Sequence, residues 1–464
     1  MNSLLTRIVL AATLLTPTFI SQAEVDNYRL LLQRTDRVIV HFNEKPTEAR
    51  ALAFIKQGAT HGGYGVAAGK RQEVLSIGAP VNLEDAKILA KGLEDDPQVK
   101  FAEPDLVMQT MRVPNDPLYN QQWQYFEARA GINLPAAWEI SIGSTENVIA
   151  VIDTGITDHK EINDRLVSGY DFVSDPWMAN DGDGWDSNPR DPGDSLQPGA
   201  CGTSFGNPIP ANTQKSSWHG THVAGTIAAK TNDNAGVSGV TWLSRVQPLR
   251  ALGRCGGYTS DIVSAIRWAA GLKVYGLPIN PDPVNVINLS LGGTALWCPL
   301  SYQDAIDEVV AAGVTVVVAA GNEQQNVAMS TPANCKNVIV VGAINRTGNR
   351  SWYSNYGTGI DIMAPGGETH FQGNGILSLY NSGLKNPQGP SYAELQGTSM
   401  ATPHIAGLID LSYAVDPTLP PSERKRLLKE TARPFASDSN CSTFRCGAGI
   451  ADAAAFLRAI RKAR

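Results

Sequence analysis

Four short motifs carry side chains that can do acid–base or nucleophilic chemistry. Asp153 ends the apolar run 148–152, His219 opens His-Gly-Thr-His, Asn322 follows Ala-Ala-Gly, and Ser399 lies in Gly-Thr-Ser-Met-Ala-Thr-Pro. A serine hydroxyl is a weak nucleophile at neutral pH, so it needs an adjacent base whose ring is fixed by a third group. A side-chain amide can in turn donate to an oxyanion that forms during the reaction. Together these residue types indicate acyl transfer.

Each motif taken alone also has a simpler interpretation. Asp153 before Thr-Gly and Asn322 after Gly are common turn residues, and Ser399 could serve only as a helix N-cap. His222 follows His219 by three residues, whereas zinc-binding histidines on helices lie four apart around a glutamate. We therefore expect His222 to be a packed, hydrogen-bonded histidine, and the chemical interpretation depends on the four motifs occurring together.

The elements that must position these residues belong to a doubly wound α/β domain. Apolar runs without in–out alternation predict central strands of a mostly parallel sheet that helices cover on both faces. These strands are expected over 148–152, 284–289, 314–319 and 338–341. Helices are expected over 220–230, 260–271, 302–312, 399–414 and 421–431, with Pro403 near the first turn of its helix. Active groups of such sheets lie beyond the carboxyl ends of the strands.

A smaller α+β unit is expected to precede this domain over residues 24–110. Its pattern of strand, helix, strand, helix and strand is ferredoxin-like, and an exposed linker follows it at 108–118. The expected elements are a strand at Arg37–Phe42, a helix at 47–57, a strand at Glu73–Ile77, a helix capped by Asn82, and a strand at Val99–Ala102.

The first 23 residues have the features of a secretory signal peptide. Arg7 precedes the apolar run 8–15, and the small residues Ser21 and Ala23 lie three positions and one position before the expected cleavage site. The run is too short to span a bilayer, and no later stretch reaches about 18 uninterrupted apolar residues. The alternative is a buried N-terminal helix. We expect a secreted protein without a membrane anchor.

Composition and cysteine usage narrow the class of protein further. A net charge of −6 over 464 residues disfavours a nucleic-acid partner, and 42% hydrophobic residues exclude global disorder. Six cysteines permit fifteen pairings, of which Cys441–Cys446 is the simplest local one. Export to an oxidising compartment favours disulfides. Zinc binding is disfavoured because no Cys-x-x-Cys motif occurs.

The four motifs, in the order Asp, His, Asn, Ser, resemble the subtilisin-like serine protease family over residues 113–464. The resemblance implies that Ser399 is the nucleophile, His219 its general base and then acid, and Asp153 the group that orients His219. It also implies that Asn322 and the Ser399 N–H hold the oxyanion. The unit ending in Phe101-Ala-Glu-Pro-Asp resembles that family's inhibitory propeptide. We therefore expect a self-processing precursor cut between about Met108 and Val113.

The resemblance extends to substrate-binding edges and disulfides. An extended peptide is expected to pair between two glycine-rich edges, with little reading of its side chains. The substrate-binding residues are expected to be Ser290, Leu291, Gly292, Gly256 and Gly257. The family's secreted bacterial members favour the pairings Cys201–Cys255 and Cys298–Cys335.

An acidic insertion at 171–217 suggests a structural calcium ion. It carries seven aspartates between 171 and 194, where Arg190 is the one basic residue. The spacing is reminiscent of a calcium loop but is not that of an EF-hand, and a solvated acidic surface is the alternative. The expected ligands are Asp175, Asp181, Asp183, Asp186, Asp191 and Asp194. Glu161 and Asn232 fall near another calcium position of the family, although the loop 230–239 differs in length.

Two other functions compete with a secreted endopeptidase acting on protein or peptide substrates. Glu323 beside Asn322 could favour a basic side chain, as in a selective kexin-like processing protease. An inactive binding homologue is disfavoured because all four motifs are intact. An α/β-hydrolase esterase is disfavoured because Gly-x-Ser-x-Gly is absent around Ser399. We expect a monomer whose own propeptide is its intramolecular inhibitor.

Overall fold

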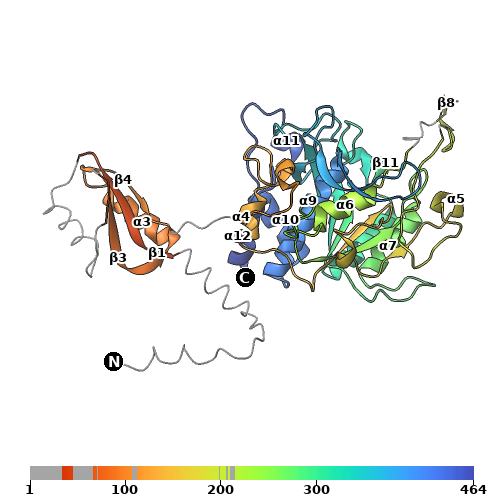
Figure 1. The fold of residues 1–464 in the computed structure, drawn as a ribbon, viewed down its shortest axis with the longest axis horizontal. Helices are drawn as coiled ribbons and strands as arrows, with labels where there is room; N and C mark the ends of the chain where they lie inside the picture. The colour runs from red at the N-terminus through yellow and green to blue at the C-terminus, as the bar shows by residue number, and fades with distance from the viewer. Residues whose placement is uncertain are drawn as a thin grey trace, which may run out of the picture. The chain divides into compact units, whose positions relative to one another are not determined.

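The computed structural model describes residues 34–44, 66–69, 72–106, 112–197, 199–204, 207–208 and 215–464, and it divides into two compact units, Met1–Thr110 and Met111–Arg464 (Figure 1). The expected signal peptide, the helix at 47–57 and residues 108–111 of the expected linker lie outside the described residues. Among the described residues, no helix combines the length and the apolar character that a membrane crossing requires.

The N-terminal unit is an antiparallel sheet in the order β2-β3-β1-β4, accompanied by one described helix. Val38, Val40 and Leu75 are core residues of this unit, together with Ala90 of the helix. The elements are β1 (Arg34–Phe42), β2 (Val66–Gly69), β3 (Gln72–Asn82), α3 (Leu83–Leu93) and β4 (Val99–Pro104).

A seven-stranded parallel sheet forms the centre of the second unit, in the order β15-β14-β12-β10-β5-β9-β6. Its strands are β5 (Val148–Asp153), β6 (Tyr170–Asp171), β9 (Arg245–Arg250), β10 (Val286–Leu289), β12 (Thr315–Ala319), β14 (Ile339–Ile344) and β15 (Ile362–Pro365). All residues of β5, β10, β12 and β14 are buried, as expected for strands covered on both faces. The predicted α/β class is confirmed.

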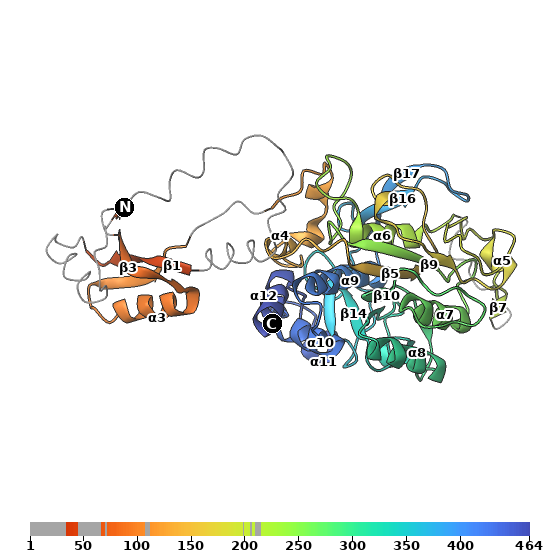
Figure 2. The same ribbon diagram turned by 90° about the horizontal axis from the view of Figure 1, so that it is seen from below.

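Helices cover both faces of this sheet. Helices α6 (His219–Ala228) and α9 (Thr398–Val415) pack together on one face, while α7 (Thr259–Ala269) and α8 (Leu300–Ala311) pack together on the other (Figure 2). The C-terminal helices α10 (Pro421–Glu430) and α12 (Ala453–Ala463) contact each other, and α12 also contacts α9. The antiparallel hairpin β16 (Ile376–Asn381) and β17 (Pro390–Leu395) lies against α6.

Three disulfides use all six cysteines. They join Cys201 to Cys255, Cys298 to Cys335, and Cys441 to Cys446. These are the pairings favoured from the sequence. The last bridge ties the short helix α11 (Thr443–Cys446) to the loop before it.

Candidate active site

Three adjacent parallel strands deliver polar residues to one edge of the sheet. Asp153 is the last residue of β5, Ser290 follows β10 directly, and Gly321 and Asn322 come shortly after β12. Since β12, β10 and β5 are neighbours in the sheet, their carboxyl ends lie side by side, about 4.8 Å apart from strand to strand. This edge is where an open α/β sheet places a ligand.

The structure brings Asp153 and His219 into direct contact. Asp153 Oδ1 lies 2.7 Å from His219 Nδ1 and accepts a second hydrogen bond, also of 2.7 Å, from the Thr154 N–H. Asp153 is fully buried, whereas 22% of the His219 side chain is exposed. The carboxylate therefore fixes the ring while the other ring nitrogen stays available for proton transfer.

A close backbone contact explains the glycine after His219. Helix α6 begins at His219, and a Cβ atom on Gly220 would lie only 2.2 Å from the Gly155 carbonyl oxygen. The Gly220 N–H also donates to Thr154 Oγ1 at 3.0 Å. Only glycine lets the start of α6 approach the Asp-Thr-Gly turn this closely.

The electrostatic surroundings favour the protonated form of His219. Burial by itself would lower its pKa, but the charge and hydrogen bond of Asp153 outweigh burial, and the pKa is raised. Asp194 and Asp191 add to this effect. Such a site stabilises an imidazolium that forms when the ring accepts a proton.

Ser399 is the second residue of α9 and lies at the same edge as Asp153. Its Oγ donates to the Ser290 carbonyl at 3.1 Å, and Ser290 Oγ donates to the Ser399 carbonyl at 2.9 Å. Asn288 Nδ2 in turn donates to Ser290 Oγ at 2.9 Å. These bonds fix the start of α9 against the end of β10.

Pro403 makes the Ser399 carbonyl available for this contact. The proline was expected near the first turn, but α9 begins at Thr398, so Pro403 lies in the second turn, inside the helix. Proline has no N–H to donate to the carbonyl four residues earlier, which is that of Ser399. The Ser290 hydroxyl takes the place of the missing donor.

Two N–H donors converge beside Ser399. Asn322 Oδ1 accepts from the Thr398 N–H at 2.8 Å and from Thr398 Oγ1 at 2.9 Å, which leaves Nδ2 free to face the other way. A Cβ atom on Gly397 would lie 3.6 Å from Asn322 Nδ2 and 3.6 Å from the Ser399 N. Both donors therefore flank one small volume at the start of α9, a suitable place for an oxyanion.

The two expected substrate edges leave the sheet on either side of β5. Ser290, Leu291 and Gly292 follow β10, while Gly256 and Gly257 follow β9. Gly256 has a φ of +103°, and the preceding residue, Cys255, is bonded to Cys201. Gly293 continues the first edge as part of β11 (Gly293–Thr294), which pairs with β13 (Ser330–Thr331).

The structure brings together only part of the expected calcium ligand set. Desolvation and the neighbouring carboxylates of Asp186 and Asp181 raise the pKa of Asp183. Within the described residues, no group of three or more His, Cys, Asp or Glu side chains could hold a metal ion. Asp175 caps the short helix α5 (Pro176–Ala179), and Asp181 pairs with Arg250 at 2.5 Å. The remaining carboxylates of the expected set, Asp183, Asp186, Asp191 and Asp194, accept backbone or hydroxyl hydrogen bonds or lie in the exposed loop.

Arg250 supplies positive charge to part of the acidic insertion. Its side chain is 1% exposed and pairs with Asp171, which is fully buried, as well as with Asp181. Burial raises the pKa of Asp171 to about 7 although Arg250 opposes this shift. Arg250 was missed because it lies in β9, far from the insertion in sequence, and a lone arginine gives no signal of its partners.

Other buried polar residues surround the triad-like cluster. Asp191 accepts from Thr154 Oγ1 at 2.8 Å, and Asp194 accepts from the N–H and Oγ of Ser217 at 2.6 and 2.7 Å. His222 is fully buried, and its Nε2 lies 2.9 Å from the Ile376 carbonyl oxygen, which is the packed role expected for it. Burial lowers the pKa of His222 to about 3.

Comparisons with known proteins agree with this geometry. The model of the Subtilase family (Peptidase_S8) matches residues 144–449. The chain is 46% identical to an extracellular protease of Xanthomonas campestris pv. campestris over 83% of this chain and 64% of that protein. It is 39% identical to an extracellular basic protease of Dichelobacter nodosus over 81% of this chain and 61% of that protein. The chain thus spans less than two thirds of the length of these two relatives.

A solved structure resembles the chain as well. It is described as proteases from Pseudoalteromonas arctica, and it shares 46% sequence identity with a TM-score of 0.71. The match covers 75% of this chain and all of the other.

Proposed function

Because the chain belongs to the subtilase family, we propose that it is a secreted serine endopeptidase that works through an acyl-enzyme intermediate. The observation that carries this proposal is the shared sheet edge. There, Asp153 holds His219 at 2.7 Å and Ser399 is bonded to the end of the adjacent strand. Family membership and the extracellular proteases among the relatives support the substrate class, which is protein or peptide.

The proposed reaction begins at Ser399. Its Oγ turns from the Ser290 carbonyl, gives its proton to His219 and attacks the carbonyl carbon of the peptide bond. Asp153 stabilises the imidazolium, which then protonates the departing amine. Water, deprotonated by His219, attacks the acyl-enzyme, and Ser399 recovers its proton as the acid product leaves.

The proposed oxyanion site consists of Asn322 Nδ2 and the Ser399 N–H. Both donors are fixed before substrate arrives, because Thr398 holds the Asn322 amide from the opposite side. Donors that need no reorganisation stabilise developing charge more than substrate, so they raise turnover rather than affinity.

The alternatives have less support. The selective kexin-like alternative rests on Glu323 alone. This residue is exposed, and one of its carboxylate oxygens already accepts from Asn355 Nδ2 at 2.8 Å. An inactive binding homologue would not need the complete set of catalytic side chains. Calcium enters no step of the proposed mechanism.

The N-terminal unit is proposed to be the inhibitory propeptide of a self-processing precursor, following the signal peptide 1–23. Its separation from the second unit at residues 110 and 111 supports a boundary there. The cut is proposed between about Met108 and Val113.

A kinetic comparison of variants tests the proposed roles. Asn322→Ala is expected to lower kcat on a peptide amide by about 10²–10³, with KM little changed, because one of two oxyanion donors is lost. Steady-state kinetics with the purified variant provides the measurement. A kcat near that of the unmodified enzyme would remove Asn322 from the mechanism.

A further inference from the structure

The turn that carries Asn322 is held from a second side by one buried asparagine. Asn355 is fully buried and belongs to the loop between β14 and β15. Its backbone N–H donates to the Gly321 carbonyl at 3.0 Å. Its Nδ2 lies 2.9 Å from the Ala320 carbonyl oxygen and 2.8 Å from Glu323 Oε2.

The side-chain oxygen of Asn355 bonds to the chain on the other side of Asn322. Asn355 Oδ1 accepts from the N–H of Glu323 at 3.1 Å and from the N–H of Gln325 at 2.9 Å, and Nδ2 lies 2.7 Å from Ser330 Oγ. One side chain therefore bonds to the backbone on both sides of Asn322, at position 320 before it and at positions 323 and 325 after it. The turn cannot shift without breaking several of these bonds at once.

The absence of a side chain at Gly321 leaves room for the Asn355 amide. Its φ is +100°, and a Cβ atom at this position would lie 2.4 Å from Asn355 Nδ2. The glycine before Asn322 is thus required both by its backbone conformation and by the closeness of the Asn355 amide.

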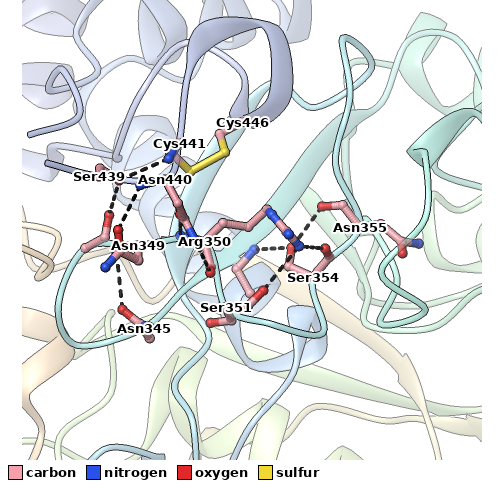
Figure 3. The surroundings of a disulfide bond; sticks show 12 residues. Asn345, Asn349, Arg350, Ser351, Ser354, Asn355, Ser439, Asn440, Cys441 and Cys446 are labelled. Carbon is pink, nitrogen blue, oxygen red and sulfur yellow. Dashed lines mark hydrogen bonds between the residues drawn. A yellow bond between two sulfur atoms is a disulfide. The ribbon is translucent and has the colours of Figure 1, made fainter. Parts of the chain in front are cut away.

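Asn355 is itself fixed by a well-anchored loop (Figure 3). The Tyr356 N–H donates to the Gln325 carbonyl at 3.0 Å, and the guanidinium groups of Arg350 and Arg445 lie 5.3 and 5.1 Å from the centre of the Tyr356 ring. The Arg350 N–H donates at 2.7 Å to Asn440 Oδ1, next to the Cys441–Cys446 disulfide.

We propose that Asn355 is a positioning residue that sets the place of the Asn322 amide in the oxyanion site. This inference rests on the proposed function. Asn355 does not touch the reacting atoms; it acts through the 320–325 turn, and Thr398 holds Asn322 from the other side. Without Asn355 the donor moves away from the point where charge develops, so turnover falls while substrate binding is retained.

The test compares Asn355→Ala with a matched buried asparagine far from the site. Asn280 is also buried, and its side chain bonds to Gln247, the Ala269 carbonyl and the Asp282 N–H, so Asn280→Ala removes a similar set of bonds. Active enzyme is counted by irreversible labelling with a fluorophosphonate, so that kcat refers to folded molecules only. Asn355→Ala is expected to lower kcat on a peptide amide by about 10-fold or more with KM within about twofold, while Asn280→Ala leaves both unchanged.

A double-mutant cycle separates positioning from general structural support. If Asn355 acts through Asn322, adding Asn355→Ala to Asn322→Ala should cost less than about threefold in kcat. Should Asn355→Ala fail to fold, Asn355→Asp is combined with Glu323→Gln. The aspartate retains an acceptor for the two N–H groups and loses the donor, the glutamine removes the repulsion that a carboxylate would meet at Glu323, and the same pattern is expected.

Two results would overturn the inference and leave the proposed function standing. One is a kcat for Asn355→Ala equal to that of Asn280→Ala, and the other is an undiminished loss in the Asn322→Ala background. Full activity of Ser399→Ala, measured in the same series, would instead overturn the proposed function itself.

Discussion

His219 shows how several carboxylates tune one side chain. Asp153 contacts the ring directly, whereas Asp194 and Asp191 act through space, and all three raise the pKa of His219 against the effect of burial. Asp194 is held by Ser217, two residues before His219. Its charge is therefore close to the proposed general base without touching it.

Asp194→Asn is expected to move the acid limb of the pH–rate profile to lower pH. The substitution removes a negative charge that favours the imidazolium, so the pKa of His219 falls and the neutral base persists to lower pH. The measurement is kcat/KM against pH for the unmodified and variant enzymes. An unchanged acid limb, or one shifted to higher pH, would contradict the assigned electrostatics.

Strand β9 is a buried element that the hydrophobic pattern of the sequence did not predict. The uninterrupted apolar runs of β5, β12 and β14 predicted those strands to within a few residues. In β9, Gln247, Pro248 and Arg250 interrupt the apolar pattern, so no strand was predicted, although nearly the whole strand is buried. Arg250 can be buried there only because Asp171 and Asp181 neutralise it.

The site residues that were predicted from the sequence lie in local motifs, whereas those that were missed depend on contacts between distant segments. Asp153, His219, Asn322 and Ser399 each belong to a recognisable local motif. The partners of the acidic insertion, and the bonds that Asn355 makes to residues 320–325, depend on contacts between segments distant in sequence. No local pattern reports such contacts.

Arg250→Met is expected to destabilise the second unit by about 3–5 kcal/mol at neutral pH, because it leaves two carboxylates without their buried partner. Burial already raises the pKa of Asp171 to about 7, and removing Arg250 raises it further. The folded protein then binds a proton that the unfolded chain releases, so the loss of stability should be smaller at pH 5 than at pH 8.

Urea unfolding at both pH values, in a Ser399→Ala background that prevents self-digestion, provides the measurement. Adding Asp171→Asn should recover part of the loss at pH 8. Equal losses at the two pH values would show that the buried ion pair is not the cause.

At the scale of the whole molecule, the site residues all lie in the second of two compact units, where the parallel sheet brings them to one edge. Strands β12, β10 and β5 bring Asn322, Ser290 and Asp153 to one edge, and α6 and α9 add His219 and Ser399 from the same face of the sheet. The N-terminal unit contributes its own antiparallel sheet and small core. The proposed precursor assigns the inhibitor to one unit and the chemistry to the other.

Ser399→Ala is expected to accumulate as a precursor that retains residues 24 to about 110. An intramolecular cut benefits from an effective concentration that no free substrate matches, and the variant lacks only the nucleophile. Intact mass of the product secreted by a host without extracellular proteases provides the measurement. A mass that begins near residue 111 would rule out self-processing.

The most direct test of the central claim is covalent labelling of the mature enzyme with a fluorophosphonate, followed by peptide mapping. One label per molecule is expected on Ser399, with no label at this position in Ser399→Ala. After the N-terminal unit has been removed from each variant by an added protease, labelling should be at least about 100-fold slower in His219→Ala, because the hydroxyl then has no adjacent base. A label on another residue, or an equal rate in His219→Ala, would contradict the proposed serine protease mechanism.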